Sequence, residues 1–246
     1  MPMYGGYLKE RLRLGASLVA LVLLVAVVRG VWPGGTAVPT FVRMTDQVLV
    51  IDPGHGGEDG GAVSAAGQRE SEVNLAIARQ LDALMGLYGV PAVLTRAEDV
   101  SIGDPSAATL RERKVSDIHE RVALVQALPD ATLICIHQNA YPAAQYHGLQ
   151  VFYGDEALSR PLARTIQDEV RAQLDPENER VPQAVAPSVY LMAHVSCRAV
   201  LVECGFLSNP EEAARLGERA YQMKLAMILA ASYLRCGDTQ EGGSLI

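Results

Sequence analysis

The amino-acid sequence predicts an α/β fold in which a mainly parallel, twisted sheet carries helices on both faces. Short apolar, β-branched runs alternate with stretches whose apolar residues recur at helical spacing. Hydrophobic residues make up 49% of the chain and charged residues 20%, which is enough apolar side chain to fill a core. The length of 246 residues suits one large domain. An apolar run lies near the N-terminus, at residues 14–28. We therefore expect a single domain that follows an N-terminal membrane segment.

Five short runs rich in Val, Ile and Leu are expected to form the strands of this sheet. They cover residues 48–51, 92–95, 132–136, 149–153 and 199–202. The first run is apolar throughout, which is typical of a strand that is buried on both faces of a parallel sheet. Ligands of such sheets bind at the carboxyl ends of the strands. The residues that follow these runs are therefore candidate site residues.

The segments between these runs have the spacing of helix faces. Apolar residues recur every three or four positions in 73–88 and in 115–125, and a helical pattern also extends over 157–174. A last helix is expected to begin after Asn209, because this N-cap residue is followed by Pro210 in the first turn. Strands that alternate with helices in this way favour parallel pairing.

The N-terminal segment has the pattern of a signal peptide or a signal anchor. Lys9, Arg11 and Arg13 precede an uncharged apolar run, residues 14–28, which is shorter than the roughly 20 residues of a straight membrane-spanning helix. No clean cleavage site follows, so we expect an uncleaved anchor with Trp32 at the outer interface. A buried core helix is disfavoured, because the run is apolar on all sides. The rest of the chain is then expected outside the cytoplasm, anchored in the membrane or secreted.

These patterns divide the chain into four parts. We expect a signal anchor or signal peptide at 1–31, a linker at 32–46, one folded domain at 47–236 and a C-terminal tail at 237–246. The linker is marked by its Gly and Pro residues. The folded domain extends from the first expected strand to the end of the last expected helix.

The charge and the cysteines exclude several classes of protein. With 21 basic and 28 acidic residues the net charge is −7, so the chain offers no broad positive surface to nucleic acid. Four cysteines are too few for a disulfide framework, and no C-x-x-C pair indicates a structural zinc site. We expect Cys135, Cys197, Cys204 and Cys236 to be packing residues. If the domain is exported, a disulfide between Cys197 and Cys204 is the pairing to consider.

Three of the expected strands end in residues that could hold a zinc ion. His55 follows the first strand within the segment DPGHGG, His137 follows the third strand, and Glu203 follows the fifth. Two imidazoles and one carboxylate form the ligand set with which zinc enzymes keep a position open for water. Glu70, where the first long helix begins, is our candidate for the third ligand, although Glu72 competes with it on spacing alone. Glu203 is then the general base.

The other histidines and the glycines have plainer explanations. His119 lies on a charged helix face and is expected to be solvated, whereas His147 and His194 lie in loop-like stretches. The glycines after the first strand match no phosphate-binding pattern such as G-x-G-x-x-G. We expect them to let the backbone bend close to the metal. They stand at positions 54, 56, 57, 60 and 61.

Three ordered motifs resemble the zinc-dependent N-acetylmuramoyl-L-alanine amidases of the amidase-3 family. The motifs are VLVIDPGHGGEDGGAVSAAGQRESEVNLAIARQL, ICIHQNA and AVLVECGFLSNPEEA, and the likeness extends over about residues 47–235. The resemblance implies a zinc enzyme that hydrolyses the amide bond between N-acetylmuramic acid and L-Ala in peptidoglycan. The residues that it implies are three Zn2+ ligands and one catalytic carboxylate: His55, Glu70, His137 and Glu203.

The alignment with this family also bears on two single positions. It favours Glu70 over Glu72, because the family's ligand stands five residues before a helix leucine, here Leu75. Cys135 stands where the family usually has Ser. This exchange of one small side chain for another is not expected to disturb the ligands.

Within the family, the chain is most similar to the germination-specific amidases of endospore formers. Residues 113–124 and 190–192 resemble segments of those enzymes, and the interval from His137 to Gly148 is too short for the helix that blocks the groove of cell-separation amidases. The resemblance implies action on glycan strands with stem peptides in the spore cortex, before muramic lactam formation, at the forespore–cortex interface. Some amidases of this type work with a lipoprotein, which makes an activating lipoprotein a candidate partner.

Two other functions stay open at this point. A zinc carboxypeptidase of wall peptides would need a cationic group to hold a terminal carboxylate, and Arg96 or Arg121 could be nominated. A non-catalytic peptidoglycan-binding module would not need Glu203, whose presence disfavours this function.

Overall fold

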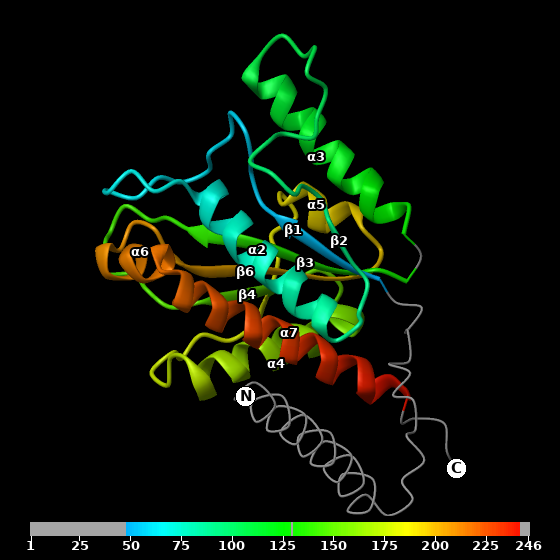
Figure 1. Ribbon diagram of the computed structural model, residues 1–246, viewed down its shortest axis with the longest axis vertical. Coiled ribbons are helices and arrows are strands. Elements are labelled where there is room, and N and C mark those ends of the chain that lie inside the picture. Colours follow the sequence, from blue (N-terminus) through cyan, green and yellow to red (C-terminus); the bar gives the residue numbers. More distant parts are fainter. Residues whose placement is uncertain (1–47, 129, 242–246) are drawn as a thin grey trace, which may run out of the picture. The chain divides into compact units, whose positions relative to one another are not determined.

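The computed structural model describes residues 48–128 and 130–241, which form one α/β domain around a six-stranded sheet (Figure 1). The expected membrane segment and linker, residues 1–46, lie outside the described residues. No helix within the described residues is both long enough and apolar enough to cross a membrane. Helix α7 (Arg219–Glu241) continues into the segment expected as a C-terminal tail.

The sheet is mainly parallel, as the sequence predicts. Its strands lie in the order β2-β1-β3-β6-β4-β5, and only the pairing of β4 with β6 is antiparallel. All five expected strands are present, and the sequence does not predict the sixth, β5, because two residues carry no periodic signal. The strands are β1 (Leu49–Pro53), β2 (Ala92–Leu94), β3 (Thr132–Asn139), β4 (Gln150–Tyr153), β5 (Gln183–Ala184) and β6 (Arg198–Phe206).

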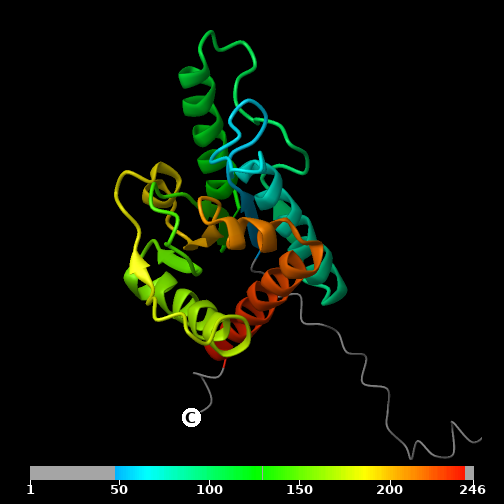
Figure 2. The same cartoon turned by 90° about the vertical axis from the view of Figure 1, so that its left-hand side faces the viewer.

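Helices cover both faces of the sheet, which also confirms the prediction. Helices α2, α4 and α7 pack on one face, and α3 and α5 pack on the other (Figure 1, Figure 2). The short helix α6 follows β6 and leads into α7. The remaining helices are α2 (Glu70–Leu87), α3 (Leu110–Gln126), α4 (Glu156–Gln173), α5 (Tyr190–His194) and α6 (Pro210–Gly217).

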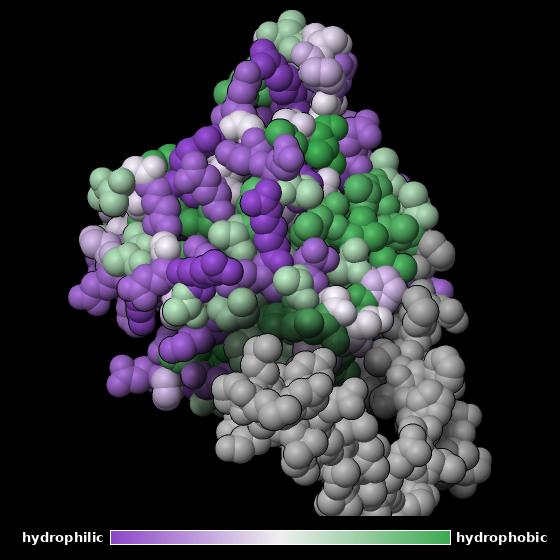
Figure 3. Space-filling view, in the orientation of Figure 1, coloured by the Kyte–Doolittle hydropathy of each residue, from purple (hydrophilic) through white to green (hydrophobic). Residues whose placement is uncertain are grey.

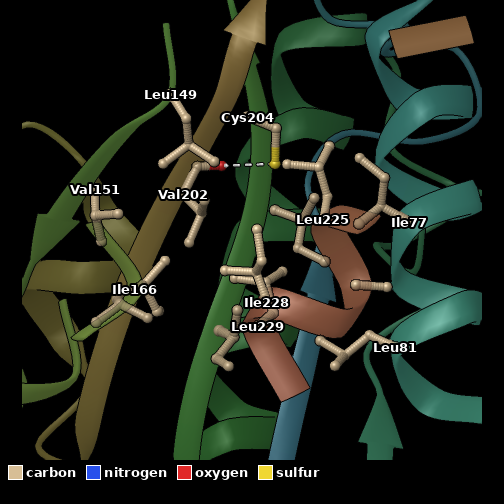
Figure 4. Close-up of a cluster of buried hydrophobic side chains, with 14 of the residues drawn as sticks. Ile77, Leu81, Leu149, Val151, Ile166, Val202, Cys204, Leu225, Ile228 and Leu229 are labelled. Atoms are coloured by element: carbon tan, nitrogen blue, oxygen red, sulfur yellow. Dashed lines mark hydrogen bonds between the residues drawn. The ribbon is translucent and has the colours of Figure 1, made fainter. Parts of the chain in front are cut away.

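The core is divided by the sheet into two clusters. Successive strand residues point to opposite faces, so Leu49 and Ile51 of β1 pack with α2 and α7, whereas Val50 packs with α3 and α5. All three side chains are fully buried, as expected for an apolar run in a parallel sheet. Figure 4 shows the larger cluster, which includes Ile77, Leu81, Val151, Ile166, Val202, Leu225, Ile228 and Leu229.

Strands β3 and β6 extend beyond the ends that the sequence predicts, which are residues 136 and 202. Their parallel ladder continues, and His137 lies opposite Glu203 in its register. The apolar pattern stops earlier, because these two side chains line a cavity and do not pack in a core. Both residues are therefore held by strand backbone and not by a loop.

The last expected helix is two helices. Asn209 caps the first of them as predicted, since its side chain accepts hydrogen bonds from the backbone N–H groups of Glu211 and Glu212. That helix ends at Gly217, where the next residue adopts an extended conformation, and α7 begins at Arg219.

The disulfide between Cys197 and Cys204, considered for an exported domain, is not formed. Cys204 lies in the core cluster on the side of α2 and α7, whereas Cys197 packs against the cluster on the side of α3 and α5. The sheet therefore separates the two sulfur atoms. Cys135 and Cys204 are buried packing residues, as expected.

The carboxyl ends of β1, β3 and β6 meet at one edge of the sheet. This edge is turned toward the viewer in Figure 2. This end of the domain is mainly hydrophilic in Figure 3, while hydrophobic side chains gather at the opposite end, on the side of β2. Residues 140–149, between β3 and β4, contain no helix. The expected absence of a blocking helix after His137 is thus confirmed for this segment.

Candidate metal centre

Three side chains that could hold a metal ion come from three parts of the fold and meet at this edge. His55 follows β1, His137 lies on β3, and Glu70 is the first residue of α2. One potential ligand atom from each lies within 4.8 Å of the others. Oε1 of Glu70 is 3.3 Å from Nε2 of His55 and 3.0 Å from Nδ1 of His137. Nε2 of His55 and Nδ1 of His137 are therefore the nitrogen atoms that could bind one metal ion together with Glu70.

The turn after β1 directs His55 into the site by an uncommon backbone conformation. His55 has φ of +62°, in the left-handed region that non-glycine residues rarely adopt. Arg121 donates a hydrogen bond of 2.8 Å to the carbonyl oxygen of His55 and another of 2.9 Å to that of Pro53. At Gly54, a Cβ atom would lie 2.2 Å from the ring of His137. A glycine there lets the backbone bend close to the ligands, as the sequence predicts.

Glu70 is the most strongly hydrogen-bonded of the three candidate ligands. Its Oε2 accepts a hydrogen bond of 2.8 Å from the backbone of Ala62, and its Oε1 accepts one of 3.0 Å from the backbone of Gln138. Burial on its own would raise the pKa of Glu70, but the hydrogen bonds with His137 and His55 hold it well below its usual range. Glu72 is exposed on the other side of α2. The structure thus brings Glu70, and not Glu72, to the other two residues.

Asp59 supports His55 from the other side of the imidazole ring. Its Oδ2 lies 2.9 Å from Nδ1 of His55, and its Oδ1 lies 2.7 Å from Nζ of Lys114. Burial on its own would lower the pKa of His55, but Asp59 and Glu70 raise it to about 9. An imidazole binds a metal ion in its neutral form, so metal binding at His55 is expected to depend on pH. The sequence does not single out Asp59, because only the turn at His55 brings its carboxylate to the imidazole.

Glu203 lies next to the three ligands without touching a partner of its own. It shares a cavity of about 280 Å³ with His55 and His137. Its Oε2 is buried and has no hydrogen-bond partner among the described residues. Burial raises the pKa of Glu203 above its usual value, which the charge of His137 opposes and the charge of Glu70 strengthens. A carboxyl group with a raised pKa can give and take a proton nearer to neutral pH.

The donor set fits a zinc ion. Two imidazole nitrogens and one carboxylate oxygen are the protein ligands of zinc sites that keep a further position open. The Nδ1 atom of His55 is held by a carboxylate, which is how metal-binding histidines are commonly oriented. Glu203 lines the same cavity, and its Oε2 has no hydrogen-bond partner among the described residues.

The three remaining histidines lie outside this cluster. His119 is exposed on α3, and His147 is exposed in a loop, as expected. His194 is not in a loop: it ends helix α5, where its ring stacks on Tyr190 with 3.7 Å between the ring centroids. A five-residue helix gives too short a pattern to be recognised in the sequence.

The family model of the N-acetylmuramoyl-L-alanine amidases, amidase-3 type, matches residues 49–232. This chain belongs to that family. The match includes every described residue of the site, from His55 to Glu203. It also includes all six strands.

Relatives and solved structures agree with this membership. The germination-specific N-acetylmuramoyl-L-alanine amidase of Bacillus subtilis (strain 168) is 34% identical over 198 residues, which is 80% of this chain and 82% of the relative. The structure of the CwlD amidase from Clostridioides difficile, in complex with the GerS lipoprotein, has a TM-score of 0.74 and 31% identity, covering 76% of this chain and 96% of that one. The amidase AmiC2 of Nostoc punctiforme has a TM-score of 0.65 and 28% identity, covering 79% and 99%.

We expect Asp59→Asn to weaken zinc binding about 10- to 100-fold, the usual loss when a supporting partner of a metal-binding histidine is changed. The amide keeps the shape of the side chain and loses the charge that favours His55 as a donor to metal. Competition with a chelator of known affinity measures the effect. Asp168→Asn is the matched control, since Asp168 lies on the exposed face of α4; equal zinc affinity of the two variants would contradict the role of Asp59.

Proposed function

We propose that this chain is a zinc-dependent N-acetylmuramoyl-L-alanine amidase of peptidoglycan in which His55, Glu70 and His137 hold the metal and Glu203 moves the proton. The observation that carries the proposal is the convergence of the three ligand atoms beside a buried carboxylate oxygen without a partner. Membership of the amidase family supplies the substrate class, an amide bond of the cell wall.

The protein's own residues have separate tasks in the reaction. A zinc ion, when bound, supplies Lewis acidity, which polarises a carbonyl oxygen and makes water more acidic. Glu203 accepts a proton from the attacking water, whose oxygen joins the lactyl carbonyl carbon of N-acetylmuramic acid. Glu203 then delivers that proton to the nitrogen of L-Ala as the carbon–nitrogen bond breaks. The products are a free carboxyl group on the muramic residue and a stem peptide with a free amine.

The structure disfavours a carboxypeptidase, because neither Arg96 nor Arg121 is available to bind a terminal carboxylate. The guanidinium of Arg96 is fully buried and donates to four backbone carbonyl oxygens. Arg121 is buried as well, in ion pairs with Asp52 and Asp117. Both arginines are used to hold the turn after β1, so neither is available for a terminal carboxylate of a substrate.

The relatives support a biological setting for the proposed reaction. Amidases of the cell wall act outside the cytoplasm, and the germination-specific relative supports a role in the spore cortex, before muramic lactam formation. The apolar run 14–28 supports an N-terminal membrane anchor. The neighbour solved with a lipoprotein supports a lipoprotein partner for this chain too.

Digestion of cortex-type peptidoglycan by the full-length chain in detergent is expected to release intact stem peptides and leave bare muramic residues. Mass spectrometry of the muropeptides detects both products. Loss of a single terminal D-Ala would indicate a carboxypeptidase, and unchanged muropeptides would indicate a binding module. Either result would overturn the proposed function.

Two isosteric changes separate the ligand from the proton carrier. Glu203→Gln should keep bound zinc while turnover falls by about 10²–10⁴, because the amide cannot accept a proton. Glu70→Gln should lose zinc together with activity, because an amide is a poor zinc ligand. Metal analysis and an amide-release assay on the two purified variants decide between these roles. Loss of zinc in Glu203→Gln with retention in Glu70→Gln would require the two carboxylates to exchange functions.

The anchor is tested by a reporter fused after Ile246. A reporter that works only outside the cytoplasm should be active, because Lys9, Arg11 and Arg13 favour a cytoplasmic N-terminus. Moving the basic residues to the other end of the apolar run is the matched control. Activity confined to a cytoplasmic reporter would contradict the proposed topology.

A further inference from the structure

An exposed cluster of aromatic rings lies beside the metal centre and has no part in the chemistry described above. We call Tyr141, Tyr146 and Phe206 the aromatic platform. The rings of Tyr141 and Tyr146 meet edge to face with 4.8 Å between centroids, and Tyr146 stacks over Phe206 at 6.3 Å. Phe206 is buried, whereas Tyr141 is 53% and Tyr146 is 42% exposed. Two large aromatic side chains therefore face solvent on a buried aromatic base.

The loop 140–149, which carries Tyr141 and Tyr146, connects β3, the strand of His137, to β4, which pairs with the strand of Glu203. Residues 140–149 leave β3 shortly after His137 and return at Gln150, which pairs with Glu203. Phe206 lies three residues after Glu203 on β6, which at about 3.3 Å per residue is roughly 10 Å along the strand. The platform thus lies within about 10 Å of Glu203 along β6, at the same edge of the sheet.

The platform is held in place by the surrounding backbone. The backbone N–H of Tyr141 donates to the hydroxyl of Ser208, and the side chain of Asn209 donates to the carbonyl oxygen of Tyr146. The guanidinium of Arg180 lies 5.1 Å from the centroid of Phe206 and so covers the base of the platform. A surface that is ordered before the ligand arrives loses little conformational entropy on binding.

The chemistry of the platform suits a neutral saccharide. A pyranose ring with equatorial substituents presents a face of C–H groups, which packs on the electron-rich face of an aromatic ring. Within the described residues, neither phenol hydroxyl has a hydrogen-bond partner, so both are available to sugar hydroxyl or N-acetyl groups. Ser208 and Asn209, which contact the two tyrosine segments, are uncharged. The charged neighbours contact Phe206: buried Glu212 accepts a hydrogen bond from its backbone N–H, and Arg180 lies over its ring.

We infer that the aromatic platform is a glycan subsite that binds a sugar ring next to the muramic residue whose amide is cleaved. This inference rests on the proposed function for the position of the cleaved bond. It assigns the glycan strand to the side of the loop 140–149 and leaves the stem peptide on the side of α3. The subsite adds affinity for polymeric substrate and takes no part in bond breaking.

Binding to peptide-free glycan oligomers tests the subsite without any hydrolysis. The full-length chain should bind these oligomers, and Tyr141→Ala with Tyr146→Ala should weaken binding about tenfold, the effect expected from losing stacked rings. The pair of Phe substitutions should retain most of the affinity, because the rings remain. Tyr88→Ala is the matched control, since Tyr88 is 54% exposed at the end of α2. Equal affinity of the double Ala variant and the unchanged protein would overturn the inference.

The kinetics separate a binding role from a structural one. For polymeric peptidoglycan, the double Ala variant should have a KM about tenfold higher with kcat unchanged, as expected when binding alone is lost. For a single muramic residue with its peptide, both constants should stay unchanged, because no neighbouring sugar is present. A loss of kcat on both substrates would mean that the tyrosines support the fold, and would overturn the inference. If the unchanged protein binds glycan but releases no amide, the proposed function fails while the subsite stands.

Discussion

The buried guanidinium of Arg121 is the constraint on which the metal centre depends. It pairs with Asp52 of β1 at 2.5 Å and with Asp117 of its own helix at 2.7 Å, and it donates to the carbonyl oxygens of Pro53 and His55. A charge buried this deeply is tolerated only when it is paired and hydrogen-bonded on all sides. These contacts hold the turn after β1 in one shape, and the left-handed conformation of His55 costs energy that this network has to offset.

The three carboxyl groups of the centre, those of Asp59, Glu70 and Glu203, differ in the direction of their pKa shifts, and only the pKa of Glu203 is raised. Glu70 and Asp59 are held as anions, because each is hydrogen-bonded to imidazole and to backbone or lysine donors. Glu203 has none of these donors, and burial raises its pKa. Carboxylates in one small region thus have opposite pKa shifts, which is a common way for a site to separate a ligand from a general base. The difference arises from the imidazole and lysine side chains that hydrogen-bond to Glu70 and Asp59, because Glu203 has no such partner among the described residues.

The sequence predicts the parallel sheet and the residues that gather at the site, because both leave local signals: apolar runs and ligand-type side chains close to their ends. It fails where the signal is a contact between distant segments. His137 and Glu203 belong to strands through their mutual register, which hydrophobicity along the chain does not reveal. Asp59 is one acidic residue among many until the turn at His55 brings it to the imidazole. Strand β5 exists only because β4 lies beside it.

The two sides of the centre differ in chemistry, and this difference gives the substrate a direction. On the side of α3, the cavity is lined by charged groups, among them Lys114, which is half exposed and adjoins the carboxylate that supports His55. On the side of β4, the exposed rings are the uncharged side chains of Tyr141 and Tyr146, and the cation of Arg180 lies over the buried Phe206. The amide in peptidoglycan joins a neutral sugar to a peptide that carries carboxylates. A glycan strand on the aromatic side therefore leaves the peptide on the side of α3, where Lys114 is the half-exposed cation of the cavity wall.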